Sequence, residues 1–106
     1  MLNSSIPGMP TSIHTNDVID QWILRDSLKI VSVHFNMPTN QMIIDLNTQA
    51  KLEFLISDFP ILNGASKADL ELFTLIGDGI GIHWPKLDED LSLKGFLLAD
   101  LKKRVG

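Results

Sequence analysis

Cysteine is absent from all 106 residues. The chain can therefore form no disulfide, and it offers no thiolate as a metal ligand or as a nucleophile. The N-terminus lacks a basic segment followed by an apolar run, so we expect no signal peptide. No apolar run approaches the ~20 residues that a transmembrane helix needs, which argues against membrane insertion. Together these absences favour a protein of the reducing cytoplasm.

Basic residues are also scarce. Lysine and arginine number 9 against 13 aspartates and glutamates, which gives a net charge of -4. Only Lys102, Lys103 and Arg104 are adjacent, and no aromatic residue lies between them. Nucleic-acid binding depends on cations that neutralise phosphates, so this composition argues against it. An acidic surface is a mild indication of a basic partner, although it is more often simply a soluble surface.

The N-terminal quarter divides into two parts that differ in composition. Residues 1–12 hold two prolines, a glycine and three serines, which predicts a flexible tail. Residues 13–27 form a predicted helical extension, capped by Asn16 or Asp17. Its apolar stripe consists of Val18, Ile19, Trp22 and Ile23. Two roles stay open for this extension: it mediates homodimerisation, or it closes the core.

From residue 28 the apolar period changes to two, and residues 28–106 form a single predicted α+β domain. Three segments alternate between apolar and polar residues, and short turns between them favour an antiparallel meander. Their inward positions are predicted to be Val31, Val33 and Phe35; Met42, Ile44 and Leu46; and Leu52, Phe54 and Ile56.

Phe59-Pro60 ends this strand pattern, because proline cannot donate to a ladder. Ser66 is then placed to cap a short helix over 67–71, and two short strands follow over 73–76 and 80–84. Ser92 is placed to cap a C-terminal helix with an apolar face. We therefore predict a mainly antiparallel sheet of four or five strands. The C-terminal and the short central helix would cover one face and leave the other face or an edge free for a partner.

Residues 79–92 read GIGIHWPKLDEDLS and carry the most specific pattern of the chain. The pattern comprises Gly81, Ile82, His83, Trp84, Pro85, Leu87, Asp88, Glu89, Asp90, Leu91 and Ser92. It closely resembles the signature of the domain-of-unknown-function family 2442, which consists of small bacterial proteins. The resemblance spans about residues 28–98. Two positions depart from the family pattern: Asn47–Ala50 replaces the usual Asp-Gly turn, and Ile61 replaces a common basic residue. Some members continue into a helix-turn-helix domain, and none follows here, so we do not expect DNA binding.

The acidic triplet Asp88, Glu89 and Asp90 has two interpretations. It could hold a divalent cation or supply acid–base groups. Alternatively, it lies just before the helix capped by Ser92 and stabilises the positive helix N-terminus. We favour the structural interpretation, or contact with a partner, because no ligand set accompanies the acids.

His83 is the only candidate general base in the signature. We expect Ile80, Ile82 and Trp84 to point into the core, which places Gly81 and His83 on the opposite face. That face could be a binding surface. The simpler alternative, which we favour, is that His83 anchors the Trp84-Pro85 corner through a hydrogen bond to Asp88 or Asp90. Gly81, Trp84, Pro85 and Ser92 are interpreted as structural.

Two functional hypotheses follow. In the first, the protein is a non-enzymatic interaction module. The family resemblance implies an antitoxin-like role, since members are commonly encoded beside small proteins of the unknown-function family 4160. Contact residues would be His83, Asp88, Glu89 and Asp90, with no catalytic residue, metal or cofactor. In the second, the protein is a metal- or ligand-binding domain or small hydrolase that uses His83, Asp88 and Asp90.

Overall fold

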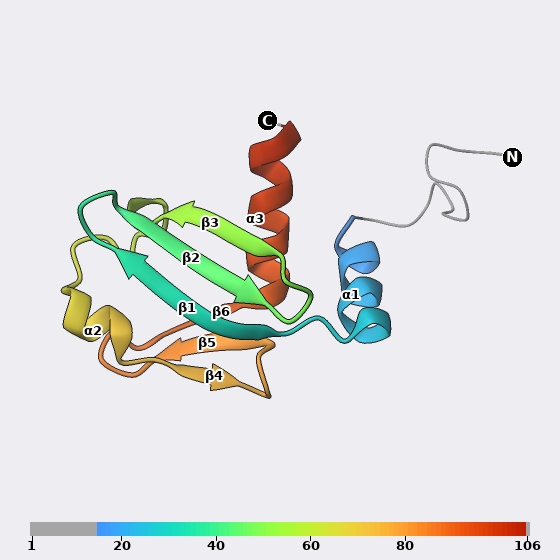
Figure 1. Cartoon of the computed structure of the whole chain (residues 1–106), viewed down its shortest axis with the longest axis horizontal. Coiled ribbons are helices and arrows are strands. Elements are labelled where there is room, and N and C mark those ends of the chain that lie inside the picture. The colour runs from blue at the N-terminus through green and yellow to red at the C-terminus, as the bar shows by residue number, and fades with distance from the viewer. Residues whose placement is uncertain (1–14, 106) are drawn as a thin grey trace, which may run out of the picture.

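A computed structural model describes residues 15–105 (Figure 1). It confirms the α+β class, with six strands divided between two antiparallel three-stranded sheets. The elements are α1 (Thr15–Asp26), β1 (Ile30–Asn36), β2 (Gln41–Leu46), β3 (Lys51–Leu55), η1 (Ile56–Asp58), α2 (Lys67–Glu71), β4 (Thr74–Ile76), β5 (Gly81–Trp84), β6 (Glu89–Ser92) and α3 (Leu93–Val105).

The first sheet is the predicted meander, in the order β1-β2-β3. The inward positions predicted for the second and third strands are all buried, although the last of them, Ile56, belongs to η1 because β3 ends at Leu55. In β1 the prediction is wrong at Val31, which is 54% exposed, while Ile30 is buried. The register shifts between Ile30 and Ser32, so a β-bulge at this point turns Ile30 inward and Val31 outward.

The second sheet has the order β4-β5-β6, and its strands pair with no strand of the first sheet. The single sheet of four or five strands is therefore replaced by two smaller ones. The reason lies in the connection: after β3 the chain passes through η1, a series of turns and α2 before β4 begins a new ladder. Strand β6 was not predicted, because its acidic residues suggested the lead into a helix.

One hydrophobic core joins both sheets to α3. It contains Ile82 and Trp84 of β5, the inward residues of β1–β3, and Leu93 and Phe96 of α3. The ring of Phe96 lies 5.6 Å from that of Phe54 and 5.7 Å from that of Phe59. Helix α3 packs against β3, and α2 packs against β1, as expected for the two covering helices. In Figure 1 the second sheet lies below β1, and α3 stands beside β3.

Helix α1 packs against α3. Ile19 is buried, and Lys94 Nζ donates to Asp20 Oδ2 at 2.8 Å. The helix begins at Thr15, so the predicted caps Asn16 and Asp17 lie inside it. The predicted flexible tail, residues 1–12, lies outside the described residues.

None of the helices within residues 15–105 combines the length and the apolar composition needed to cross a bilayer.

Candidate functional site

The signature residues form the hairpin β5–β6. Ile82 pairs with Leu91, His83 with Asp90, and Trp84 with Glu89. Leu87 N donates to Trp84 O at 3.2 Å within the turn. Asp88 closes the turn with a φ of 51°, a left-handed conformation that aspartate tolerates better than most residues.

His83 and Asp90 are neighbours on the solvent-facing side of this hairpin. His83 Nδ1 and Asp90 Oδ1 are hydrogen bonded, and the two side chains are 39% and 66% exposed. A carboxylate can only accept, so Nδ1 carries the hydrogen and Nε2 is left for solvent or a ligand. This is the anchoring contact that we favoured for His83.

The acidic triplet does not lead directly into α3, which corrects the helix-capping interpretation. Glu89 and Asp90 belong to β6, and only Ser92 caps the helix, where its Oγ accepts from Gly95 N at 3.0 Å. The dipole effect is confined to the first turn, so Asp88 at the far end of the hairpin lies outside it.

The three acids also point in different directions. Asp88 is exposed in the turn, Asp90 faces solvent beside His83, and Glu89 lies opposite Trp84 and is half-buried. In residues 15–105, no lysine or arginine forms an ion pair with any of the three. Among the residues whose side chains the structure describes, no group of three or more His, Asp or Glu could hold a metal ion.

Trp84 and Gly81 support the hairpin. The Trp84 side chain is fully buried, and its Nε1 donates to Leu70 O of α2 at 2.9 Å. A Cβ at Gly81 would lie 3.1 Å from Leu91 O and 3.3 Å from Ile76 Cδ1. Glycine therefore lets Ile76 lie against the sheet. Ile80, predicted to point inward, is 47% exposed because it lies in the turn before β5.

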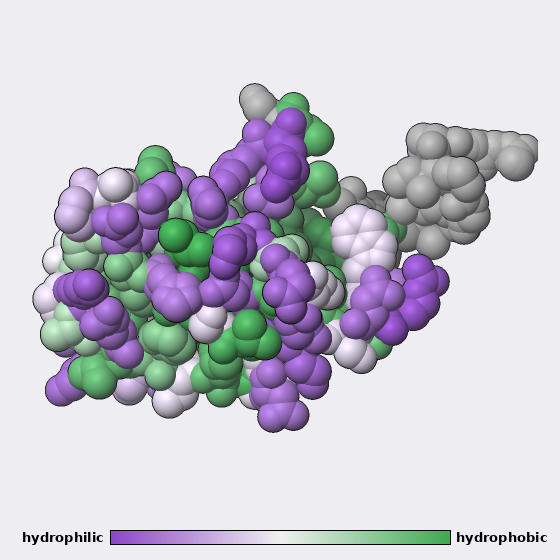
Figure 2. Space-filling model, in the orientation of Figure 1, coloured by the Kyte–Doolittle hydropathy of each residue, from purple (hydrophilic) through white to green (hydrophobic). Residues whose placement is uncertain are grey.

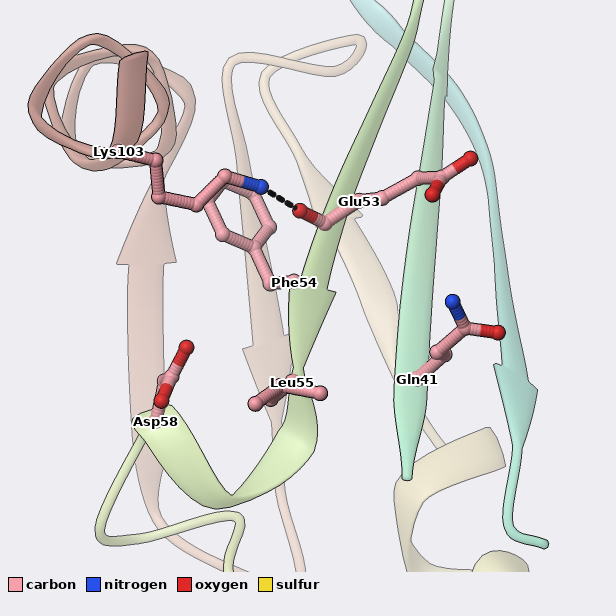
Figure 3. A pocket seen from close by; sticks show the side chains of 6 residues that line it. All are labelled: Gln41, Glu53, Phe54, Leu55, Asp58 and Lys103. Atoms are coloured by element: carbon pink, nitrogen blue, oxygen red, sulfur yellow. Dashed lines mark hydrogen bonds between the residues drawn. The ribbon is translucent and has the colours of Figure 1, made fainter. Parts of the chain in front are cut away.

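A pocket between β3 and α3 was missed by sequence reasoning. Its volume is about 270 Å³, and it is lined by Gln41, Glu53, Phe54, Leu55, Asp58 and Lys103. Figure 3 shows Lys103 reaching from α3 to the backbone of β3, where Nζ donates to Glu53 O. Nζ also lies 4.9 Å from the centre of the Phe54 ring. Lys103 thus binds the Glu53 carbonyl oxygen on the outer edge of β3. No residue of the signature lines this pocket.

A polar network on the outer face of the first sheet was also missed. Asp45 Oδ2 accepts from Ser32 Oγ at 2.6 Å and lies 2.8 Å from His34 Nε2, while Asp45 Oδ1 accepts from Lys51 Nζ at 2.6 Å. The hydrogen bond from Lys51, followed by that from Ser32, lowers the pKa of Asp45 from 3.8 to about 2. Alternation places these residues on one face, but only the register of β1, β2 and β3 brings them together.

This network predicts a pH-dependent contribution to stability. Because the folded pKa of Asp45 is lowered, its contribution is fully present above about pH 4 and is lost as the pH falls through about 2. Asp45→Asn should lower the free energy of unfolding at neutral pH by about 1 kcal/mol, since His34 and Lys51 are largely exposed and solvent screens the network. The free energies of unfolding of the wild type and of Asp45→Asn should become equal as the pH approaches about 2. Urea denaturation across this range measures the difference, with Asp26→Asn as an exposed control. If the difference in the free energy of unfolding between the two proteins stays constant with pH, the lowered pKa of Asp45 is wrong.

Two solved structures share this fold. A crystal structure of a protein of unknown function from Rhodospirillum rubrum ATCC 11170 is 29% identical, with a TM-score of 0.61 over 68% of this chain and 87% of that chain. The solution structure of an uncharacterised protein from Chromobacterium violaceum is 22% identical and shares the fold, with a TM-score of 0.63 over 87% of each chain. No curated protein matches the chain.

The family profile described as protein of unknown function (DUF2442) matches residues 30–100. This range covers both sheets and most of α3, including the whole β5–β6 hairpin. The chain therefore belongs to the DUF2442 family.

Proposed function

We propose that the protein is a non-enzymatic interaction module that binds a small partner protein of the cytoplasm through the β5–β6 hairpin. One observation carries the proposal: Asp88 and Asp90 are exposed on the β5–β6 hairpin, and no lysine or arginine in residues 15–105 pairs with either of them. Acids displayed in this way attract a cationic surface and steer its approach.

The net charge of -4 favours the same kind of partner. An antitoxin-like role, in which the protein binds and neutralises its partner, is the form of this proposal that the family resemblance suggests. The second hypothesis, a metal- or ligand-binding domain or small hydrolase, has less support. Of its three residues, His83 and Asp90 are in contact, while Asp88 lies in the turn and completes no three-residue cluster.

Charge reversal at the hairpin tests the proposal. The protein is used to capture partners from a lysate of the source bacterium, and the captured protein is then purified and titrated by calorimetry. Asp88→Lys/Asp90→Lys should weaken binding at least about tenfold, because attraction becomes repulsion. Asp26→Lys/Asp58→Lys changes the net charge equally at exposed positions elsewhere, and it should bind nearly as wild type.

Far-ultraviolet circular dichroism and urea denaturation check that both double variants fold. Equal affinities for the wild type and a folded Asp88→Lys/Asp90→Lys protein would reject the hairpin as the contact surface. Saturable binding of Mg²⁺, Mn²⁺ or Zn²⁺, abolished by His83→Ala, would instead favour the second hypothesis.

A further inference from the structure

Strand β4 is an edge strand with an open side. Within residues 15–105 it pairs only with β5, and all three of its residues are exposed. Leu93 N donates to Ile80 O just beyond the two strands, in the register of the β5–β6 ladder. By alternation, Ile82 and Trp84 of β5 bond towards β6. Antiparallel ladders alternate, so Gly81 and His83 bond towards β4. By the same alternation, the N–H and C=O of Leu75 point away from β5, towards the open side.

Apolar side chains surround this open edge. Leu72, Leu75, Ile76 and Ile80 are 52%, 36%, 37% and 47% exposed. Figure 2 shows hydrophobic surface over β4. An exposed apolar strand edge of this kind is a template for pairing with another chain.

Strand β3, at the edge of the first sheet, is protected from pairing with another chain. Helix α3 packs against β3, and Lys103 covers the Glu53 carbonyl oxygen. Lysine at an edge is a common means of blocking further pairing. In contrast, the six residues between Glu71 and Asp78 include no charged side chain and no proline. Strand β4 thus lacks the features that keep β3 closed.

The charges at the two ends of β4 indicate what can pair there. The side chains of Glu71 and Asp78 are 55% and 90% exposed. Each has one lysine at the limit of ion-pair distance, Lys67 at 3.9 Å and Lys29 at 4.0 Å. Exposed pairs of this length are weak and screened by solvent, so both ends of the strand stay largely acidic.

A second copy of the chain is a poor occupant for this edge. Antiparallel self-pairing centred on Leu75 would place Glu71 of each copy opposite Gly79 of the other, one residue from Asp78. Like charges would then meet at both ends, which destabilises strand pairing. A foreign strand with apolar residues in its centre and basic residues at both ends would match the edge in shape and in charge.

We propose that an extended segment of the partner protein adds as a fourth strand along the outer edge of β4. The segment is apolar at its centre and carries lysine or arginine at both ends. Main-chain hydrogen bonds to Leu75 provide the pairing, and Glu71 and Asp78 provide the preference for basic ends. This inference rests on the proposed function and names the chemistry of the partner.

A synthetic strand tests the proposal with the full chain. The probe is the peptide Lys-Lys-Val-Thr-Val-Thr-Val-Lys-Lys, and its control is the same peptide with the N–H groups of one edge methylated. Calorimetry should show saturable binding of the probe, at least about tenfold weaker binding of the methylated control, and weakening with added salt. In ¹⁵N-resolved spectra, the Leu75 amide should shift and its hydrogen exchange should slow.

Two variants separate the backbone contact from the side chain. Leu75→Pro removes the outward N–H without removing a donor of the β4–β5 ladder, whereas Leu75→Thr shortens the side chain and keeps the N–H. We expect Leu75→Pro to reduce affinity at least about tenfold and Leu75→Thr to retain most of it. Should Leu75→Pro not fold, Leu75→Lys is the replacement, since it repels the basic strand and leaves the backbone intact. Glu71→Gln/Asp78→Asn should remove most of the salt dependence.

Several results would overturn the proposal: no saturable binding of the probe, equal binding of the methylated control, spectral shifts confined to residues outside β4, or a dimer through β4 in sedimentation. A partner whose affinity falls with Asp88→Lys/Asp90→Lys but not with Leu75→Pro would overturn strand addition and leave the proposed function standing. If neither Asp88→Lys/Asp90→Lys nor Leu75→Pro weakens binding of the partner, both the strand addition and the proposed function are rejected.

Discussion

Trp84→Ala should lower the free energy of unfolding by about 3–5 kcal/mol, the usual cost of deleting a buried aromatic side chain. Trp84 is fully buried in the core shared by the two sheets. Its loss would leave a cavity and would also remove the indole donor from Leu70 O. Since small domains are stable by only about 5–15 kcal/mol, the variant should be close to unfolding at 37 °C. Urea denaturation followed by circular dichroism measures the change.

The second tryptophan provides a matched control. Trp22 lies on α1 and is 43% exposed, so Trp22→Ala should cost no more than about 1 kcal/mol. Trp84→Phe keeps a ring in the core but leaves Leu70 O without its donor, and it should give an intermediate loss. Equal costs for Trp22→Ala and Trp84→Ala would contradict the packing described above.

Gly79→Ala should also be strongly destabilising, by at least about 3 kcal/mol. Gly79 has a φ of 119°, where residues with a Cβ are strained. Its carbonyl oxygen accepts from Ile30 N at 2.8 Å, which ties the β4–β5 turn to the start of β1. A Cβ at this position would overlap Ile30 O and would lie 2.9 Å from Ile30 N. The two sheets would have to separate where they meet.

Gly64 distinguishes the two causes of this loss. It also has a positive φ, 87°, but a Cβ there would meet nothing within 4 Å. Gly64→Ala should therefore show only the conformational cost, about 1–2 kcal/mol. Denaturation of both variants gives the difference, and hydrogen exchange of the Ile30 amide should accelerate in Gly79→Ala alone. Similar losses in both variants would show that the contact with Ile30 is unimportant.

Much of the local structure was predictable from the chain itself. The alternation of Met42, Ile44 and Leu46, and of Leu52, Phe54 and Ile56, specifies which side of each strand is buried. The caps at Ser66 and Ser92 were likewise predictable, because a cap requires only a side chain and the backbone three residues later. These features depend on neighbours within a few residues, where the type of residue decides the conformation.

Features that depend on pairing between distant segments were not predictable in this way. Val31 turns outward because β1 has a bulge where it pairs with β2. Residues 88–90 belong to a hairpin because β6 pairs with β5. The meeting of Lys103 with Glu53, like that of Ser32 with Asp45 and Lys51, depends on where α3 and three strands come to lie.

The features of the candidate site likewise fall into those that depend on local sequence and those that depend on contacts between distant segments. The signature residues, the burial of Trp84 and the acidic character of residues 88–90 follow from the order of residues along the chain. The contact of His83 with Asp90, the divergence of the three acids and the open apolar edge of β4 arise from the way the strands pair in three dimensions. Residue type and short spacing act locally along the chain, whereas register and exposure are properties of the assembled sheets.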